Sequence, residues 1–177
     1  MTDFRLKNDR LENWTQEKKV VEGRLNINFK EEKKIKYRIQ PWSVWWFDIG
    51  ENVGTETGGH VYTDPEKVSH KRPCIVISTN NFQNASFNAK VVIMPLTSKK
   101  AHTKIRHFHF ELDHTKYRGF YDRRKHIRYE GLNKQSLVIC NEIKTIDTKR
   151  LTQAIYPVLK EEDITDIQSF IKRYISI

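Results

Sequence analysis

Four histidines lie between residues 102 and 114, and their imidazoles are the first groups in the sequence that could move protons. They are His102, His107, His109 and His114. On a strand, His107 and His109 would share one face, and a pair of imidazoles can act as base and acid. A metal site is disfavoured because no neighbouring cysteine or carboxylate cluster completes the ligand set. Histidines on the surface of a basic segment are the simpler interpretation.

A glycine-rich loop supplies a second candidate, Glu56. The loop runs from Gly54 to Gly59 and lacks the Gly-Lys-Ser/Thr ending with which a nucleotide-binding loop holds phosphate. Nucleotide binding is therefore not expected. Glu56 either pairs with a neighbouring cation or accepts a proton, and the residue taken alone favours the ion pair.

Three tryptophans near the start of the apolar part of the sequence could stack nucleic-acid bases. They are Trp42, Trp45 and Trp46. Side chains alternate along a strand, so Trp45 and Trp46 should face opposite sides and at least one should lie in the core. For the other, a dimer interface and a base-stacking surface are both open.

The chain is strongly basic, and the excess is concentrated in one stretch. Its 177 residues include 32 Lys and Arg and 22 Asp and Glu, a formal charge of +10. Residues 99–128 hold ten Lys and Arg against three acidic residues, a net charge of +7. Such an excess favours RNA, DNA or an anionic membrane surface as partner. A groove lined by this stretch would attract a phosphate backbone.

The sequence lacks the apolar segments of membrane and secreted proteins. It has no apolar run of 18 residues, and its N-terminus lacks the apolar stretch of a signal peptide. A soluble, cytoplasmic protein without membrane contact is expected. Cys74 and Cys140 each lie in an apolar run, which indicates reduced, buried thiols rather than a disulfide framework or a zinc site.

The elements that must position these residues begin at Pro41, where short apolar runs alternate with turn residues. The runs predict strands at 44–49, 74–78, 90–95, 106–112 and 137–143. Apolar residues spaced by three and four from Ile164 to Tyr174 predict a C-terminal helix capped by Asp163. Strands and helices do not alternate. We therefore expect a mainly β fold, a small antiparallel barrel or strongly coiled sheet closed by the helix.

Residues 1–40 have a different character. They hold eleven Lys and Arg against seven acidic residues, and their pattern predicts a polar helix over 6–24. We divide the chain into a charged, partly helical extension at 1–40 and a barrel domain at 41–177. The extension is either a solvated appendage or a segment that covers the substrate site or binds a partner, where Trp14 could add a stacking surface.

Four short patterns follow one another along the barrel domain. They are Trp45–Glu56, Lys71–Ser78, Val91–Ser98 and Gly131–Asp147 with Arg150-Leu151. In this order they resemble the MazF/PemK family of toxin endoribonucleases, from Pro41 to the C-terminus. The resemblance implies an SH3-like barrel, a homodimer, and sequence-selective cleavage of single-stranded RNA (mRNA) without metal or cofactor. It also implies a toxin–antitoxin pair, with a cognate antitoxin covering the basic groove. Residues 1–40 lie outside the resemblance, and the loop at 57–71 is longer than is usual in the family.

The resemblance also assigns functional positions. Arg72 of the Arg-Pro pattern and Thr97 of the Pro-Leu-Thr-Ser pattern match the catalytic residues, and Glu56 of Gly-Thr-Glu is a weaker match. In metal-free cleavage the ribose 2′-hydroxyl attacks the adjacent phosphorus and leaves 2′,3′-cyclic phosphate and 5′-hydroxyl ends. Arg72 would stabilise the charge on the phosphorane, and Thr97 would hold a phosphate oxygen. Glu56 or, failing it, His102 would be the base.

Further residues are expected to contact the RNA. They are Lys71, Ser98, His102, Lys104 and Arg106. Taken singly, an arginine such as Arg72 would pair with an acid and Thr97 would cap a turn. Two other functions remain open on the same barrel: a non-catalytic nucleic-acid-binding module whose site is blocked by the long loop and N-terminal helix, and a poison of DNA gyrase.

Overall fold

The computed structural model describes most of the barrel domain and a few residues of the N-terminal extension. The described residues are 12, 14–16, 18–20, 39–50, 60–61, 68–69, 71–79, 90–101 and 103–175. Glu56, His102 and most of the predicted helix at 6–24 lie outside them.

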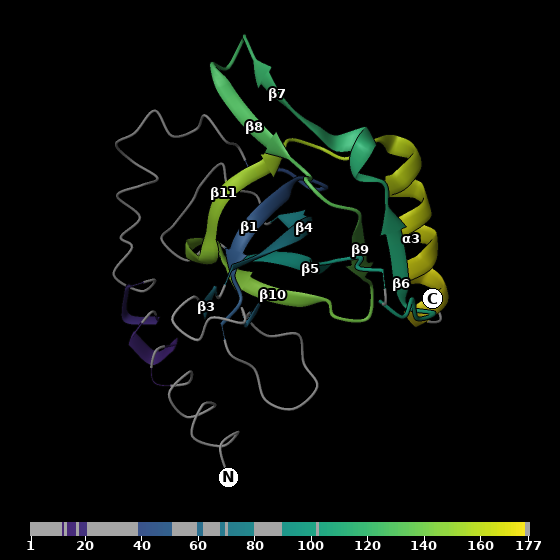
Figure 1. Ribbon diagram of the computed structural model, residues 1–177, viewed down its shortest axis with the longest axis horizontal. Helices are drawn as coiled ribbons and strands as arrows, with labels where there is room; N and C mark the ends of the chain where they lie inside the picture. Colours follow the sequence, from purple (N-terminus) through teal and green to yellow (C-terminus); the bar gives the residue numbers. More distant parts are fainter. Residues whose placement is uncertain are drawn as a thin grey trace.

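One antiparallel sheet of seven strands forms the body of the molecule (Figure 1). Its strands are β1 (Val44–Asp48), β4 (Lys71–Thr79), β5 (Lys90–Ser98), β6 (His109–Leu112), β9 (Ser136–Ile139), β10 (Lys144–Asp147) and β11 (Leu151–Tyr156). The order is β11-β1-β4-β5-β9-β6, and β10 also pairs with β5. The first half of β5 pairs with β10 and the second half with β9, so the sheet changes partners along this strand.

Smaller elements surround the sheet. They are β2 (His60–Val61), β3 (Val68–Ser69), β7 (Arg118–Asp122), β8 (Ile127–Gly131), two 3-10 turns at His114–Tyr117 and Thr148–Arg150, and the helix α3 (Glu161–Ile175). Strands β7 and β8 form a separate two-stranded sheet, a hairpin that stands out from the main sheet (Figure 1). Helix α3 lies beside β6 (Figure 1). Among the described residues, no helix is long and apolar enough to cross a membrane.

The sheet carries a hydrophobic core on each face, as the alternation along β4 shows. Ile75 belongs to one core, which includes Ile164 and Ile167 of α3. Cys74 and Val76 belong to the other, which β8 and β10 help to cover. Because both faces are buried, the central strands are apolar almost throughout.

Helical residues of the N-terminal extension contact the sheet through Trp14. Its side chain is only 5% exposed, and the Arg150 guanidinium lies 5.6 Å from the ring centroid. Gly50, at φ +76°, lies directly beneath the ring, and a Cβ at this position would overlap it. Trp14 is therefore a packing residue here and does not offer a free stacking surface. Residues 12, 14–16 and 18–20, the described part of the predicted helix, are helical.

The predicted fold class is confirmed: the protein is mainly β, with an antiparallel sheet and one C-terminal helix. Strands are found in all five predicted runs. Trp45 is buried, as expected for one of the adjacent tryptophans, while Trp46 is half-buried and donates its Nε1 hydrogen to Glu130.

Two local predictions were wrong. The strand expected at 106–112 begins only at His109, because the chain turns before it and His109 N donates to Arg106 O. His107 and His109 therefore do not share a strand face. Asp163 does not cap α3, which begins at Glu161; its carboxylate instead accepts hydrogen bonds from Tyr117 Oη and Lys116 Nζ.

Candidate active site

Arg72 lies on β4 and Thr97 on β5, two strands that pair with each other in the main sheet. The pairing ends at Cys74 opposite Pro95, and the same antiparallel register extended by two residues would set Arg72 across from Thr97. Side chains two residues apart share a face, so both point to the face of Cys74 and Val76. Both side chains are half-buried. A guanidinium and a hydroxyl 25 positions apart in the sequence thus share one face of the sheet, each two residues beyond the end of the β4–β5 pairing.

Two charged residues that the sequence reasoning missed lie at this spot. Lys144 is opposite Ile93 on β10, which places it on the same face as Thr97. Glu142, in the turn before β10, lies with its carboxylate 3.6 Å from Lys144 Nζ. No signal in the sequence pointed to Glu142: the run at 137–143 predicted a single strand, whereas β9 ends at Ile139 and Glu142 lies in the turn that follows, where its backbone NH donates to Ile139 O.

Burial lowers the pKa of the Arg72 guanidinium below its ordinary value, and the Glu142 carboxylate opposes that shift. The guanidinium still carries its charge at neutral pH, since arginine is not deprotonated in proteins. Glu142 also gives Arg72 the acidic neighbour expected of an arginine taken singly. The result is a partly desolvated cation in a defined position, the kind of group that interacts strongly with a phosphate.

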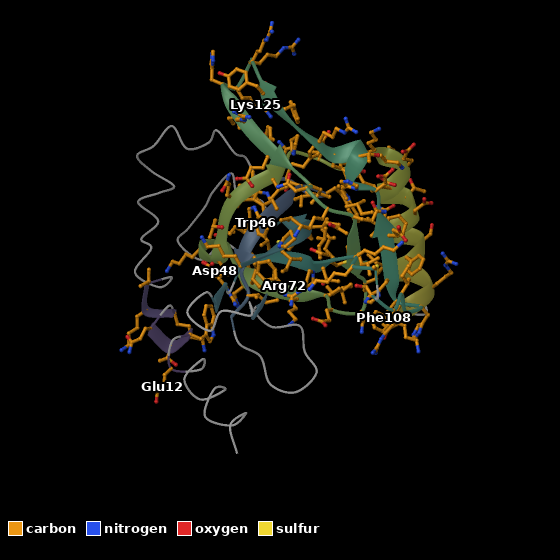
Figure 2. The ribbon with its side chains drawn as sticks, in the orientation of Figure 1. Glu12, Trp46, Asp48, Arg72, Phe108 and Lys125 are labelled. Carbon is orange, nitrogen blue, oxygen red and sulfur yellow. The ribbon has the colours of Figure 1, made fainter. Side chains whose placement is uncertain are left out.

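The predicted RNA contacts occupy different places. Lys71 and Ser98, the neighbours of Arg72 and Thr97, are both exposed. Lys104 and Arg106 are exposed in the segment before β6, where the Arg106 guanidinium lies 5.9 Å from the centroid of the Phe108 ring. Figure 2 shows Arg72 in the body of the sheet and Phe108 at its edge. Lys71 and Ser98 therefore adjoin the candidate site, whereas Arg106 lies beside Phe108, away from Arg72.

The basic stretch at 99–128 extends across a large part of the molecule. Figure 2 places Phe108 and Lys125, two residues of this stretch, at opposite ends of the molecule. Part of the charge is also neutralised: Lys99 Nζ lies 2.7 Å from the Glu111 carboxylate, and Lys116 Nζ contacts Glu162 and Asp163. Hydrogen bonds to Glu162 and Asp163 raise the pKa of Lys116 to about 12.

The described histidines serve separate structural contacts. His107 stacks on Tyr174, with ring centroids 6.2 Å apart, and His114 Nδ1 lies 3.0 Å from Gln135 Oε1. Burial and the neighbouring Arg106 lower the pKa of His109. Within the described parts of the chain, no group of three or more His, Cys, Asp or Glu residues could hold a metal ion.

The two cysteines are free and buried, as predicted. Burial raises the pKa of both thiols, that of Cys140 to about 11. Because the thiolate is the reactive form, neither side chain is suited to nucleophilic chemistry at neutral pH.

Comparison with known proteins agrees with the sequence patterns. Residues 40–175 match a family model described as a PemK-like, MazF-like toxin of type II toxin–antitoxin systems. Solved structures with a similar chain include the Mycobacterium tuberculosis toxin MazF-mt6, with 15% identity, 68% of this chain and 98% of that chain covered, and a TM-score of 0.43. Another is an endoribonuclease in complex with its cognate antitoxin from a mycobacterial species, with 13% identity, 78% and 96% covered, and a TM-score of 0.44. No curated protein matches the chain.

Proposed function

The chain belongs to the PemK-like, MazF-like toxin family of type II toxin–antitoxin systems, and on that premise we propose that it is an endoribonuclease that cleaves single-stranded RNA at Arg72 and Thr97. The observation that supports this assignment is the β4–β5 register: extended two residues beyond Cys74 and Pro95, it would set Arg72 and Thr97 opposite each other on one face. Binding RNA alone would not require a half-buried guanidinium facing a hydroxyl.

The proposed reaction uses the RNA as its own nucleophile. The 2′-oxygen loses its proton and forms a bond to phosphorus, and the bond from phosphorus to the 5′-oxygen breaks as that oxygen takes up a proton. The products are a 2′,3′-cyclic phosphate and a 5′-hydroxyl. Because the RNA supplies the nucleophile and Arg72 the positive charge, the proposed scheme uses no metal or cofactor. The protein must stabilise the phosphorane charge and align the two oxygens.

Arg72 supplies the charge in this scheme. Its guanidinium can donate to two phosphate oxygens at once, and partial burial strengthens its interaction with developing negative charge. Thr97 Oγ1 donates to a phosphate oxygen and fixes its orientation. The high pKa of arginine makes Arg72 an electrostatic stabiliser rather than an acid. Glu56 and His102, the predicted bases, lie outside the described residues, and their role stays a prediction.

Glu142 is proposed as a positioning residue. Its carboxylate lies 3.6 Å from Lys144 Nζ, and its negative charge acts on the pKa of Arg72. A carboxylate in this place orients the guanidinium without contacting the reacting atoms. Its removal should therefore change turnover more than RNA binding.

The assembly and surroundings follow from the family assignment and stay proposals. We expect a symmetric homodimer in the cytoplasm, and an antitoxin that covers the RNA-binding surface. Residues 41–177 would be the nuclease domain, and residues 1–40 an extension attached through Trp14. Light scattering gives the mass of the assembly directly, and a monomer that cleaves RNA would contradict the dimer.

One experiment tests the function. Purified protein is incubated with long RNA in excess EDTA, and the fragment ends are mapped, with the Arg72→Ala variant as the matched control. We expect discrete cuts with 5′-hydroxyl ends from the wild type and none from the variant. A requirement for divalent metal, or 5′-phosphate ends, would contradict the mechanism. RNA bound without cleavage would instead favour the binding-module alternative, and gyrase inhibition without RNA binding would favour the poison.

A further inference from the structure

The hairpin formed by β7 and β8 carries a concentration of positive charge away from the candidate active site. Its loop contains four consecutive basic residues, Arg123 to His126, and Arg128 follows on β8. Figure 2 shows Lys125 at the projecting hairpin and Arg72 in the body of the sheet, well apart from it. The charge of this hairpin therefore does not serve the Arg72 site directly.

The base of the hairpin is firmly packed. Ile127 and Tyr129 are 2% and 3% exposed and belong to the second core, and Phe120 stacks on Tyr129 with ring centroids 5.2 Å apart. The Glu130 carboxylate accepts hydrogen bonds from Trp46 Nε1 at 3.2 Å and Gln153 Nε2 at 2.7 Å. These contacts fix the direction in which the hairpin projects.

Strands β7 and β8 approach each other closely at the base of the hairpin because each strand has a glycine there. Gly131 has φ +75°, and a Cβ there would overlap the backbone of Gly119 and of residues beside it. Gly119 is in turn too close to the Glu130 backbone to carry a side chain. The two glycines allow a tight, well-defined ribbon rather than a loose loop.

The tip is built so that its charges stay available. Asp122 Oδ1 accepts the backbone hydrogens of Arg124 and Lys125 at 3.0 and 3.1 Å, and its other oxygen lies 4.0 Å from Lys125 Nζ. The one acidic side chain at the tip is thus occupied by the turn and by Lys125. Arg123, Arg124 and Arg128 have no ion-pair partner among the residues that the structure describes.

An exposed aromatic ring lies among these cations. Tyr121 is directly opposite Arg128 in the β7–β8 register and is 54% exposed. Alternation along the ribbon puts both on the face opposite the buried Ile127 and Tyr129. The Tyr121 hydroxyl lies 3.3 Å from His126 Nδ1, which ties the ring to the turn.

We propose that this face of the hairpin, Tyr121 and Arg128 with Arg123 and Arg124 at the tip, binds single-stranded RNA as a second contact outside the cleavage site. The inference rests on the proposed function for its substrate class. Unpaired arginines would bind phosphates, and a ring presented among them would stack on a base between those phosphates. An acidic protein segment would use the cations but would have no need of an isolated ring without surrounding apolar surface.

The first test removes the charge. Binding is measured with a 2′-fluoro single-stranded oligonucleotide, which lacks the nucleophilic 2′-oxygen, for the wild type and for Arg123→Gln/Arg124→Gln/Arg128→Gln. The matched control is Lys160→Gln/Lys172→Gln/Arg173→Gln, three exposed cations beside or on α3. The hairpin variant should bind about tenfold more weakly and lose roughly 2 from the slope of log affinity against log salt. The affinity of the control variant for the oligonucleotide should stay within about twofold of the wild-type affinity, because the rest of the basic chain still attracts RNA.

The second test separates stacking from charge. Tyr121→Ala should weaken binding of the single strand by about tenfold, while Tyr121→Phe retains wild-type affinity. On a duplex of the same composition, whose bases are already stacked, both variants should bind like the wild type. An equal effect of Tyr121→Ala on single strand and duplex would overturn the stacking role and with it the preference for single strands.

The outcomes distinguish this proposal from the proposed function. If the wild type cuts long RNA but the hairpin triple variant binds the oligonucleotide like the wild type, the hairpin proposal fails alone. If the wild type cuts no RNA, the function fails, and the uncleavable probe still reports on the hairpin. If polyglutamate binds the hairpin as tightly as the oligonucleotide does, the proposal of RNA as its partner is overturned in favour of an acidic protein.

Discussion

Arginines in two regions of the molecule carry the same charge in opposite surroundings. Arg72 is half-buried at the end of the central sheet with Glu142 acting on it, whereas Arg123 and Arg124 lie exposed at the tip of a projecting hairpin. Water and salt screen an exposed cation, so it contributes mainly to affinity and to its salt dependence. A partly desolvated cation held in one position can instead stabilise charge that develops during a reaction. The environment, more than the residue type, separates the two proposed roles.

The sharpest test of this comparison is Arg72→Ala. The variant should cleave RNA about a thousandfold more slowly, because an interaction that strengthens in the transition state is lost. Its affinity for the uncleavable oligonucleotide should change far less. Single-turnover cleavage and equilibrium binding measure the two effects separately. Equal losses in cleavage and binding would mean that Arg72 is simply another phosphate contact.

A third arginine tests whether partial burial alone is enough to give an arginine a role in cleavage. Arg150 donates hydrogen bonds to the carbonyl oxygens of Asp48 and Ile49 at 2.7 and 2.6 Å, and burial lowers its pKa much as it does for Arg72. Arg150→Ala should lower the free energy of unfolding by about 2 kcal/mol, since two charge-assisted hydrogen bonds are lost. Denaturant unfolding measures this, and the cleavage rate of the folded variant should stay near that of the wild type. A large loss of cleavage with unchanged stability would remove the distinction between Arg150 and Arg72.

Glu142→Gln tests how Arg72 is held. We expect turnover to fall about tenfold with little change in KM, because misplacing a catalytic group costs rate rather than binding. Glu142→Asp keeps the charge and should recover part of the rate. If Glu142→Asp is as slow as Glu142→Gln while both fold normally, the carboxylate does not act by orienting the guanidinium.

The smallest effect is expected from the exposed cations before β6. Lys104→Gln/Arg106→Gln should weaken RNA binding about threefold and reduce the salt slope by roughly 1.4, the value for two phosphate contacts to a single strand. Turnover at saturating RNA should not change. Titration of binding against salt measures the slope, and a change in turnover would place these residues closer to the reaction than the structure does.

Much of the fold was predictable because the local signals and the tertiary structure agree. The apolar runs around Ile75 and Ile93 are buried on both faces of the sheet, and such runs read as strands without knowledge of their partners. The failures occurred where a local pattern was outweighed by a distant contact. Asp163 has the residue type of a helix cap, but its carboxylate is engaged by Tyr117, and the helix begins before it.

The candidate site was predictable only in part for the same reason. Arg72 and Thr97 were found through short sequence patterns, but their alignment depends on the register of two strands, which no single residue specifies. The charge of Glu142, in the turn before β10, acts on the pKa of Arg72, an interaction between residues 70 positions apart in the sequence. Likewise, alternation in residues 106–112 predicted one strand, because the turn at Arg106 left no signal in the polarity of the residues.

The place of β1 in the sheet sets when the domain can fold. Trp46 on β1 is paired with Pro73 on β4 on one side and with Gln153 on β11 on the other. One edge of β1 therefore stays unpaired until β11, a strand much later in the sequence, is available. Closing so long a loop is slow, and until β11 is made β1 keeps an unpaired edge. A ribosome-bound chain that lacks residues 151–156 therefore cannot complete the sheet. Folding, and any activity that depends on it, is deferred until residues 151–156 are free to pair with β1.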